Sequence, residues 1–138
     1  MISALDTNVL LDVLTGDERF WQASLSAIEQ ASSLGSLVIC DVVYAELCGQ
    51  FQSQAECDRF LAENGIGVER ISREAMWMAS RAWRRYRQSG GKKDRVLADF
   101  LIGGHASVQA SCLVSRDRGV YGTYFEDVRV VDPSSGDH

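Results

Sequence analysis

The chain has few of the residues on which metal–thiolate, disulfide-bonded and membrane proteins depend. Its 138 residues include four cysteines, two histidines and one proline. The cysteines form no Cys-x-x-Cys pair, so we expect reduced, mostly buried thiols and no zinc site. No apolar run approaches the roughly 20 residues that a membrane helix needs. The N-terminus also has no basic region, long apolar stretch or cleavage site, so we expect a cytoplasmic protein that does not contact a membrane.

What the chain does contain is the composition of one globular domain. Hydrophobic residues make up 46% and charged residues 24%, and a chain of this length can bury a core without disulfides or a structural metal. The formal net charge of -5 argues against a protein that simply coats nucleic acid, because such a protein binds through a basic surface. It does not exclude a nuclease, since an acidic cluster that binds cations contributes to the same total.

Apolar periodicity alternates between short strand-like runs and longer helical runs, which indicates an α/β fold with a mostly parallel sheet. Strands are predicted at 2–5, 37–40, 67–71, 112–115 and 128–131. Helices are predicted at 7–14, 19–33, 42–51, 54–64, 72–88 and from about 94 onward, with Asp41 and Ser72 as N-caps. We expect a single domain over 1–132 and a short flexible tail at 133–138, opened by Pro133.

Four acidic residues lie where predicted strands end or predicted helices begin: Asp6, Glu46, Asp99 and Asp117. In an open α/β sheet, the carboxyl ends of parallel strands and the adjacent helix starts meet at one edge. An acid after a strand is by itself more often a turn or capping residue. The joint pattern of four is what predicts that these side chains converge in one cleft.

Several carboxylates in one cleft indicate a bound cation. Two unit charges about 4 Å apart repel by about 4 kcal/mol at an effective dielectric near 20. Carboxylate oxygens favour Mg²⁺ or Mn²⁺, with one or two ions per site. Such ions polarise phosphodiesters and lower the pKa of bound water, so the pattern predicts metal-assisted hydrolysis. Thr7 and Ser115 are hydroxyls beside two of the acids and can orient a carboxylate or a water.

Four blocks of the sequence resemble the PIN domain, and most closely the VapC-like toxin ribonucleases of toxin–antitoxin pairs. The blocks are Leu-Asp-Thr-Asn-Val-Leu-Leu-Asp at 5–12, Ala-Glu-Leu at 45–47, Ala-Asp-Phe-Leu-Ile-Gly-Gly-His-Ala at 98–106, and Ser-Arg-Asp at 115–117 followed by Tyr-Phe at 124–125. They occur in the order and spacing of that family and cover nearly the whole chain.

The resemblance implies a three-layer α/β/α sandwich with a mostly parallel sheet. It also implies a Mg²⁺- or Mn²⁺-dependent endoribonuclease that acts as a toxin, forms a homodimer and is inhibited by a small cognate antitoxin. The family's acidic and metal-binding positions fall on the same four acids, and its supporting hydroxyls fall on Thr7 and Ser115.

A basic stretch precedes the Asp99 helix and holds candidate RNA contacts. Half of the 14 basic residues lie between positions 81 and 95. Lys92, Lys93 and Arg95 are predicted to bind RNA phosphates near the cleft. Arg95 stands four residues before Asp99, so an ion pair with that carboxylate is the alternative.

Other conspicuous side chains have structural explanations. Trp77, Trp83 and Tyr86 can stack on bases, but their position on or beside an apolar helical stripe favours core or dimer packing. His105 is predicted to be a packing residue. Asp12, like Asp41 and Asp94, is predicted to be a turn or capping residue.

Two other functions stay open beside the toxin. One is a solitary PIN-domain nuclease in RNA processing, and the other is a PIN module that binds RNA or a partner without cleaving anything. The four acids and their hydroxyl neighbours favour an enzyme. A phosphoryl-accepting receiver domain is disfavoured, because no lysine lies near a late strand to complete its site.

Overall fold

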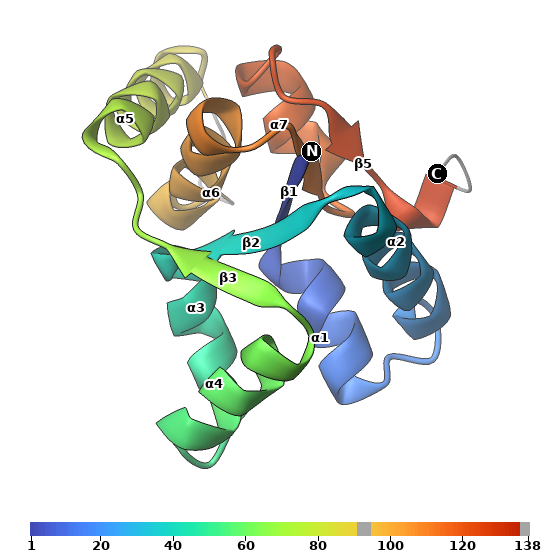
Figure 1. Cartoon of the computed structure of the whole chain (residues 1–138). Coiled ribbons are helices and arrows are strands. Elements are labelled where there is room, and N and C mark those ends of the chain that lie inside the picture. The colour runs from blue at the N-terminus through green and yellow to red at the C-terminus, as the bar shows by residue number, and fades with distance from the viewer. Residues whose placement is uncertain (91–94, 136–138) are drawn as a thin grey trace.

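The computed structural model describes residues 1–90 and 95–135 (Figure 1). Its strands are β1 (Ile2–Leu5), β2 (Ser36–Cys40), β3 (Ile66–Glu69), β4 (Cys112–Val114) and β5 (Val130–Val131). Its α-helices are α1 (Thr7–Thr15), α2 (Trp21–Leu34), α3 (Asp41–Cys48), α4 (Gln54–Glu63), α5 (Arg73–Gln88), α6 (Leu97–Gln109) and α7 (Arg118–Tyr124), and a 3₁₀ helix, η1, covers Pro133–Ser135.

The five strands form one parallel sheet in the order β3-β2-β1-β4-β5. The first strand of the chain is therefore the central one, with β2 on one side and β4 on the other. The backbone N–H of Asp6 continues the pairing with β4 by donating to the carbonyl of Val114 at 3.0 Å. The residue that follows β1 is thereby held between the ends of two neighbouring strands.

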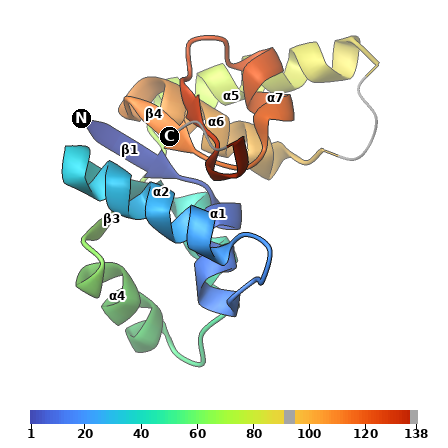
Figure 2. The same ribbon diagram turned by 90° about the vertical axis from the view of Figure 1, so that its right-hand side faces the viewer.

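Helices cover both faces of the sheet, which confirms the predicted three-layer α/β/α arrangement. Figures 1 and 2 place α2 on one face and the pair α5 and α6 on the other. α2 contacts β1 and β2, whereas α6 contacts β4. α1, α3 and α4 extend below the sheet in Figure 1, on the side where β1 ends.

α5 and α6 pack closely because small residues line their contact. Ala75, Ala79 and Ala82 of α5 are fully buried. A Cβ atom at Gly104 of α6 would lie 2.4 Å from the backbone oxygen of Ala75, so only glycine fits at this position.

The aromatic residues of α5 divide between core and surface. Trp83 and Tyr86 pack on Phe100, with ring centroids 5.1 and 5.3 Å from its ring, as the core prediction requires. Trp77 is 59% exposed, and the guanidinium of Arg81 lies 4.4 Å from the centre of its ring. Trp77 is therefore a surface residue.

The boundaries of several elements differ from the prediction. Asp41 is the first residue of α3 rather than its N-cap, which is Cys40, and no side chain caps this helix. α6 begins at Leu97, and α7 is an additional short helix. Within the predicted tail, Pro133–Ser135 form η1, and residues 136–138 lie outside the described part of the chain, as does Asp94. No helix among the described residues is long and apolar enough to cross a bilayer.

Candidate active site

Asp6 is the centre of the site, and it is almost completely buried. It follows β1 directly and caps α1, where its Oδ1 accepts a hydrogen bond from the backbone N–H of Thr7 at 2.7 Å. Its Oδ2 accepts from Ser115 Oγ at 2.7 Å, Tyr121 Oη at 3.1 Å and Asn8 Nδ2 at 3.3 Å. These donors hold the carboxylate in one orientation at the carboxyl edge of the sheet.

The surroundings of Asp6 disfavour its charge. Burial raises its pKa from 3.8 to about 6, although hydrogen bonds from Ser115, the Thr7 backbone and Tyr121 act in the opposite direction. The negative charge of Asp117 raises it further. The four groups that donate to this carboxylate are all neutral, so a bound cation would supply the positive charge that favours its ionised form.

Tyr121 connects Asp6 with the other acids. Burial raises the pKa of its hydroxyl, and the charges of Asp6, Asp99 and Asp117 raise it further. The hydroxyl therefore stays protonated and donates to Asp6. Because all three charges act on the pKa of Tyr121, the three carboxylates lie around this one hydroxyl. The sequence-based interpretation does not include Tyr121, although it lies only four residues after Asp117.

Ser115 connects the loop after β4 with the start of α1. Its fully buried hydroxyl donates to Asp6 and accepts from the backbone N–H of Asp117 at 3.0 Å. Asn8 donates to the same oxygen at 3.3 Å, and its own Oδ1 accepts from the backbone N–H of Arg116 at 3.2 Å. Ser115 lies where a supporting hydroxyl can orient Asp6.

Thr7 supports the fourth acid. Its buried hydroxyl donates to Glu46 Oε1 at 2.6 Å. Glu46 is exposed on α3, so this hydrogen bond gives its carboxylate a defined contact with the start of α1.

Asp99 and Asp117 have different partners. Asp99, in the first turn of α6, accepts from the backbone N–H of Val96 at 3.2 Å through Oδ2. Asp117 accepts hydrogen bonds from both terminal nitrogens of Arg95, with Nη2 lying 3.3 Å from Oδ1. It also accepts one from the backbone N–H of Gly119 at 3.2 Å. The ion pair of Arg95 is therefore made with Asp117, where the sequence suggested Asp99. Lys92 and Lys93 lie outside the described residues.

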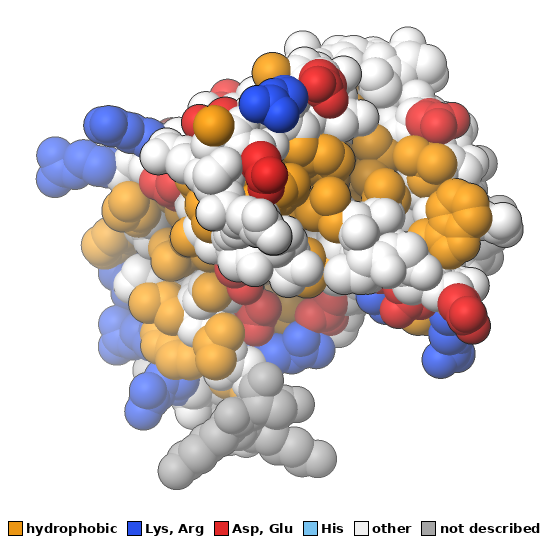
Figure 3. Space-filling view, turned by 90° about the horizontal axis from the view of Figure 1, so that it is seen from below, with side chains coloured by type: hydrophobic (Ala, Val, Ile, Leu, Met, Phe, Trp, Pro, Cys, Tyr) orange, Lys and Arg blue, Asp and Glu red, His pale blue; other side chains and the backbone are white. Residues whose placement is uncertain are grey.

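The four predicted acids lie at one edge of the sheet but not at ligand spacing. Within residues 1–90 and 95–135, no three Asp, Glu, His or Cys side chains are placed to hold one metal ion. Figure 3 shows acidic and basic side chains side by side in a hollow of the face seen from below. The donors are all hard oxygens, so their chemistry fits Mg²⁺ or Mn²⁺. In this arrangement, Arg95 neutralises the charge of one of the four acids, Asp117.

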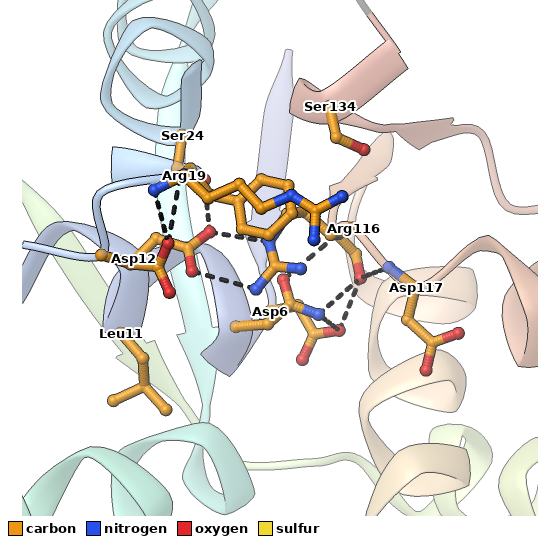
Figure 4. Close-up of polar contacts among 12 residues, drawn as sticks. Asp6, Leu11, Asp12, Arg19, Ser24, Arg116, Asp117 and Ser134 are labelled. Atoms are coloured by element: carbon orange, nitrogen blue, oxygen red, sulfur yellow. Dashed lines mark hydrogen bonds and ion pairs between the residues drawn. The ribbon is translucent and has the colours of Figure 1, made fainter. Parts of the chain in front are cut away.

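Asp12 has a role that the sequence does not indicate. Predicted as a turn or capping residue, it is instead buried and accepts Arg116 Nε at 2.7 Å and Nη2 at 2.9 Å, one on each carboxylate oxygen (Figure 4). Ser24 of α2 donates to the same carboxylate at 2.7 Å, and the Arg116 guanidinium lies 3.9 Å from the centre of the Phe20 ring. The two members of this ion pair are 104 positions apart, so no local pattern links them.

His105 is a buried residue away from these acids. Its side chain is 1% exposed, and Nε2 lies 2.8 Å from Glu69 Oε1 on β3. This agrees with its prediction as a packing residue.

Comparison with solved structures finds the same fold in toxin–antitoxin complexes. One is VapBC2 from Rickettsia felis bound to a promoter DNA fragment, with a TM-score of 0.74 and 18% identity over 96% of this chain and 98% of that chain. VapBC-1 from nontypeable Haemophilus influenzae has a TM-score of 0.72 and 19% identity over 97% and 99% of the two chains. DNA-bound VapBC from Salmonella typhimurium has a TM-score of 0.70 and 18% identity over 96% and 98%.

Sequence comparison gives the family. No curated protein sequence matches the chain. The PIN domain, however, matches residues 4–126, a span that contains all four acids and both supporting hydroxyls. The chain therefore belongs to the PIN domain family.

Proposed function

We propose that this protein is a divalent-metal-dependent endoribonuclease and the toxin of a toxin–antitoxin pair. The observation that carries the proposal is the buried Asp6 carboxylate at the end of the central strand, oriented by Ser115 and lying near the charge of Asp117. A charge-disfavouring environment at the ligand-binding edge of a parallel sheet is typical of a functional site. Membership of the PIN domain family supports hydrolysis of nucleic acid as its chemistry.

Asp6, Glu46, Asp99 and Asp117 are the residues that would hold one or two Mg²⁺ or Mn²⁺ ions. When bound, such ions would polarise the phosphodiester of the substrate and lower the pKa of a bound water. Ser115 fixes the direction of the Asp6 carboxylate, and Thr7 does the same for Glu46. These supporting hydrogen bonds reduce the reorganisation that metal and substrate binding would otherwise require.

The toxin assignment rests on the similar complexes, whose identity to this chain is 18–19%. It includes a cognate antitoxin, a homodimer, a cytoplasmic site of action and an RNA substrate whose phosphates contact Lys92, Lys93 and Arg95. A binding module without turnover is the second candidate. The observation that favours it is the occupation of both Asp117 oxygens by Arg95.

The test is RNA cleavage by the purified chain with Mg²⁺, with Mn²⁺ and with EDTA, for the wild type and for Asp6→Asn. We expect cleavage products with either metal, none in EDTA, and a loss of at least roughly 10²-fold in Asp6→Asn, as when a group that stabilises transition-state charge is removed. Asp41→Asn is the matched control, because Asp41 is exposed and its side chain does not cap α3.

Two results would contradict the proposal. Undiminished metal-dependent cleavage by Asp6→Asn would remove Asp6 from the site. RNA retained in a gel shift without products under any metal would favour the binding module.

A further inference from the structure

We infer that Arg116 is a positioning residue that sets the geometry of the catalytic loop at 115–117, an inference that rests on the proposed nuclease function. Its guanidinium is directed at Asp12 of α1 rather than at the four candidate metal-binding acids (Figure 4). It therefore acts through its neighbours in the chain, Ser115 and Asp117.

The guanidinium of Arg116 contacts two side chains, Asp12 and Phe20. Two parallel hydrogen bonds join it to Asp12, whose side chain is 4% exposed. The Phe20 ring lies 3.9 Å from it. Ser24 holds the carboxylate itself, because it donates to Oδ2, the oxygen that also accepts from Arg116 Nε. Paired hydrogen bonds and stacking on a ring both require the planar fork of arginine, which lysine lacks.

The backbone of the same residue is held independently. The N–H of Arg116 donates to Asn8 on α1. Asn8 and Asp12 are four residues apart, so they lie on one face of the helix, one turn from each other. A single helix face therefore holds both the backbone and the side chain of Arg116, directly after the end of β4.

This double attachment determines where two site groups lie. Ser115 must reach Asp6 with its hydroxyl, and Asp117 must present its carboxylate beside Asp6 from the same short loop. A misplacement of about 1 Å at a reacting centre can cost roughly 10²-fold in rate. Loosening the Arg116 fork should therefore impair metal binding and catalysis in a chain that remains folded.

The chain provides a matched control two residues further on. Arg118 contacts Asp132 through Nε at 3.3 Å, and its side chain is 58% exposed. Arg116→Lys and Arg118→Lys make the same chemical change in the same region. Only the first removes a guanidinium that makes two hydrogen bonds to one carboxylate and lies on an aromatic ring. Replacing both members of the pair, as Asp12→Leu with Arg116→Met, removes the buried Asp12 charge together with its partner and should preserve folding.

Each variant is compared with the wild type by calorimetric titration with Mn²⁺, by amide hydrogen exchange at 115–117, and by kcat and KM for RNA per folded molecule. We expect Arg116→Lys and the double variant to bind Mn²⁺ about 10-fold more weakly or worse, to exchange faster at 115–117, and to lose roughly 10- to 100-fold in kcat with little change in KM. Arg118→Lys should match the wild type in all three measurements.

Unchanged Mn²⁺ affinity and loop exchange in folded Arg116→Lys would overturn the inference and leave the ion pair a purely stabilising contact. A wild type that binds Mn²⁺ but cleaves no RNA would overturn the proposed function, while the Mn²⁺ and exchange measurements would still decide the role of Arg116. A wild type that binds no Mn²⁺ would overturn both.

Discussion

At the scale of single residues, Asp6 differs from the other three acids in its burial. Glu46 is exposed, and Asp99 and Asp117 are partly exposed, whereas Asp6 is 5% exposed. Its pKa of about 6 lies above the ordinary value of 3.8, so the folded chain binds this proton more tightly than the unfolded chain does. The stability that comes from the protonated group is fully present below about pH 4 and is lost as the pH rises through about 6.

Asp6→Asn should consequently stabilise the metal-free protein at neutral pH. An amide keeps the shape of the side chain and has no charge to desolvate, but its NH2 group replaces one of the two acceptor oxygens. The gain in the free energy of unfolding is therefore at most the roughly 2–3 kcal/mol that a shift of about two pKa units represents. Urea unfolding in EDTA at pH 4, 5, 6 and 7.5 measures this difference. We expect it to be largest at about pH 7.5 and to disappear near pH 4.

Asp41→Asn again serves as the control, because an exposed carboxylate has little desolvation to lose. If Asp6→Asn and wild type unfold alike at every pH, the raised pKa of Asp6 is wrong.

The ion pair between Arg95 and Asp117 leads to a second prediction at the residue scale. Arg95 donates to both oxygens of Asp117, so it competes with any cation that uses that carboxylate. The pair is partly exposed, and such pairs contribute about 1 kcal/mol or less. We expect Arg95→Ala to tighten Mn²⁺ binding by up to about 5-fold, measured by calorimetry, with Arg118→Ala as the control. Weaker Mn²⁺ binding would instead make Arg95 a support of the site, and a raised KM for RNA would favour its predicted phosphate contact.

At the scale of elements, the α5–α6 contact positions the start of α6 and therefore Asp99. α6 has paired glycines where it meets its neighbours. Gly104 faces the backbone of Ala75, and a Cβ at Gly103 would lie 2.5 Å from the ring of Phe125. The missing side chains let α6 approach α5 and the ring of Phe125, the residue after α7, closely. The backbone of Ala75 cannot turn aside as a flexible side chain can.

Gly104→Ala should therefore destabilise the protein by about 1–3 kcal/mol, the usual cost of overpacking. Gly122→Ala in α7 is the matched change, because its Cβ would meet nothing within 4 Å. Replacing this exposed helical glycine should stabilise the protein by up to about 1 kcal/mol. Thermal unfolding of both variants decides the matter, and equal melting temperatures would contradict the close packing of α5 and α6.

Local sequence signals predict the elements well where they are strong. The bounds of β1 are those expected, and Ser72 caps α5 by accepting from the backbone N–H of Ala75 at 3.1 Å. α7 is missing from the prediction because it is seven residues long and contains two glycines, Gly119 and Gly122, which resemble a loop.

The residues of the candidate site likewise divide into those that local sequence signals indicate and those that only the structure reveals. The expected strand ends are enough to indicate Asp6 and Asp117, since the topology of a parallel sheet brings such ends together. The pairing of Arg116 with Asp12 depends on side-chain packing between distant segments, and hydrophobic periodicity contains no information about it. Tyr121 belongs to the helix that the pattern does not predict, so its contact with Asp6 also depends on the structure.

At the scale of the whole molecule, positive charge is unevenly distributed. α5 alone has five arginines against one glutamate, in a chain whose net charge is -5. An anionic substrate is attracted to such a region and repelled elsewhere, and salt weakens both effects.

We therefore expect the KM for RNA cleavage to rise with KCl while kcat stays nearly constant, because phosphate contacts contribute to binding and not to chemistry. Initial rates between about 50 and 300 mM KCl measure this dependence. Replacing Arg84 and Arg87 of α5 together with glutamine should flatten it. The pair Arg59→Gln and Arg70→Gln removes the same charge from exposed positions outside α5 and should not. A KM that does not change with salt would argue against an electrostatic route to the site.

The parts of the site around β1 are synthesised at different times. Asp6 is made early, but the hydroxyl that orients it comes from Ser115, 109 positions later. At synthesis rates of about 5–20 residues per second, roughly 5–20 s separate the two. During that interval, the nascent chain contains the opening acid of the site without the strand that completes it. The hydrogen bond that orients Asp6 therefore forms only after β4 and the loop that follows it have been synthesised.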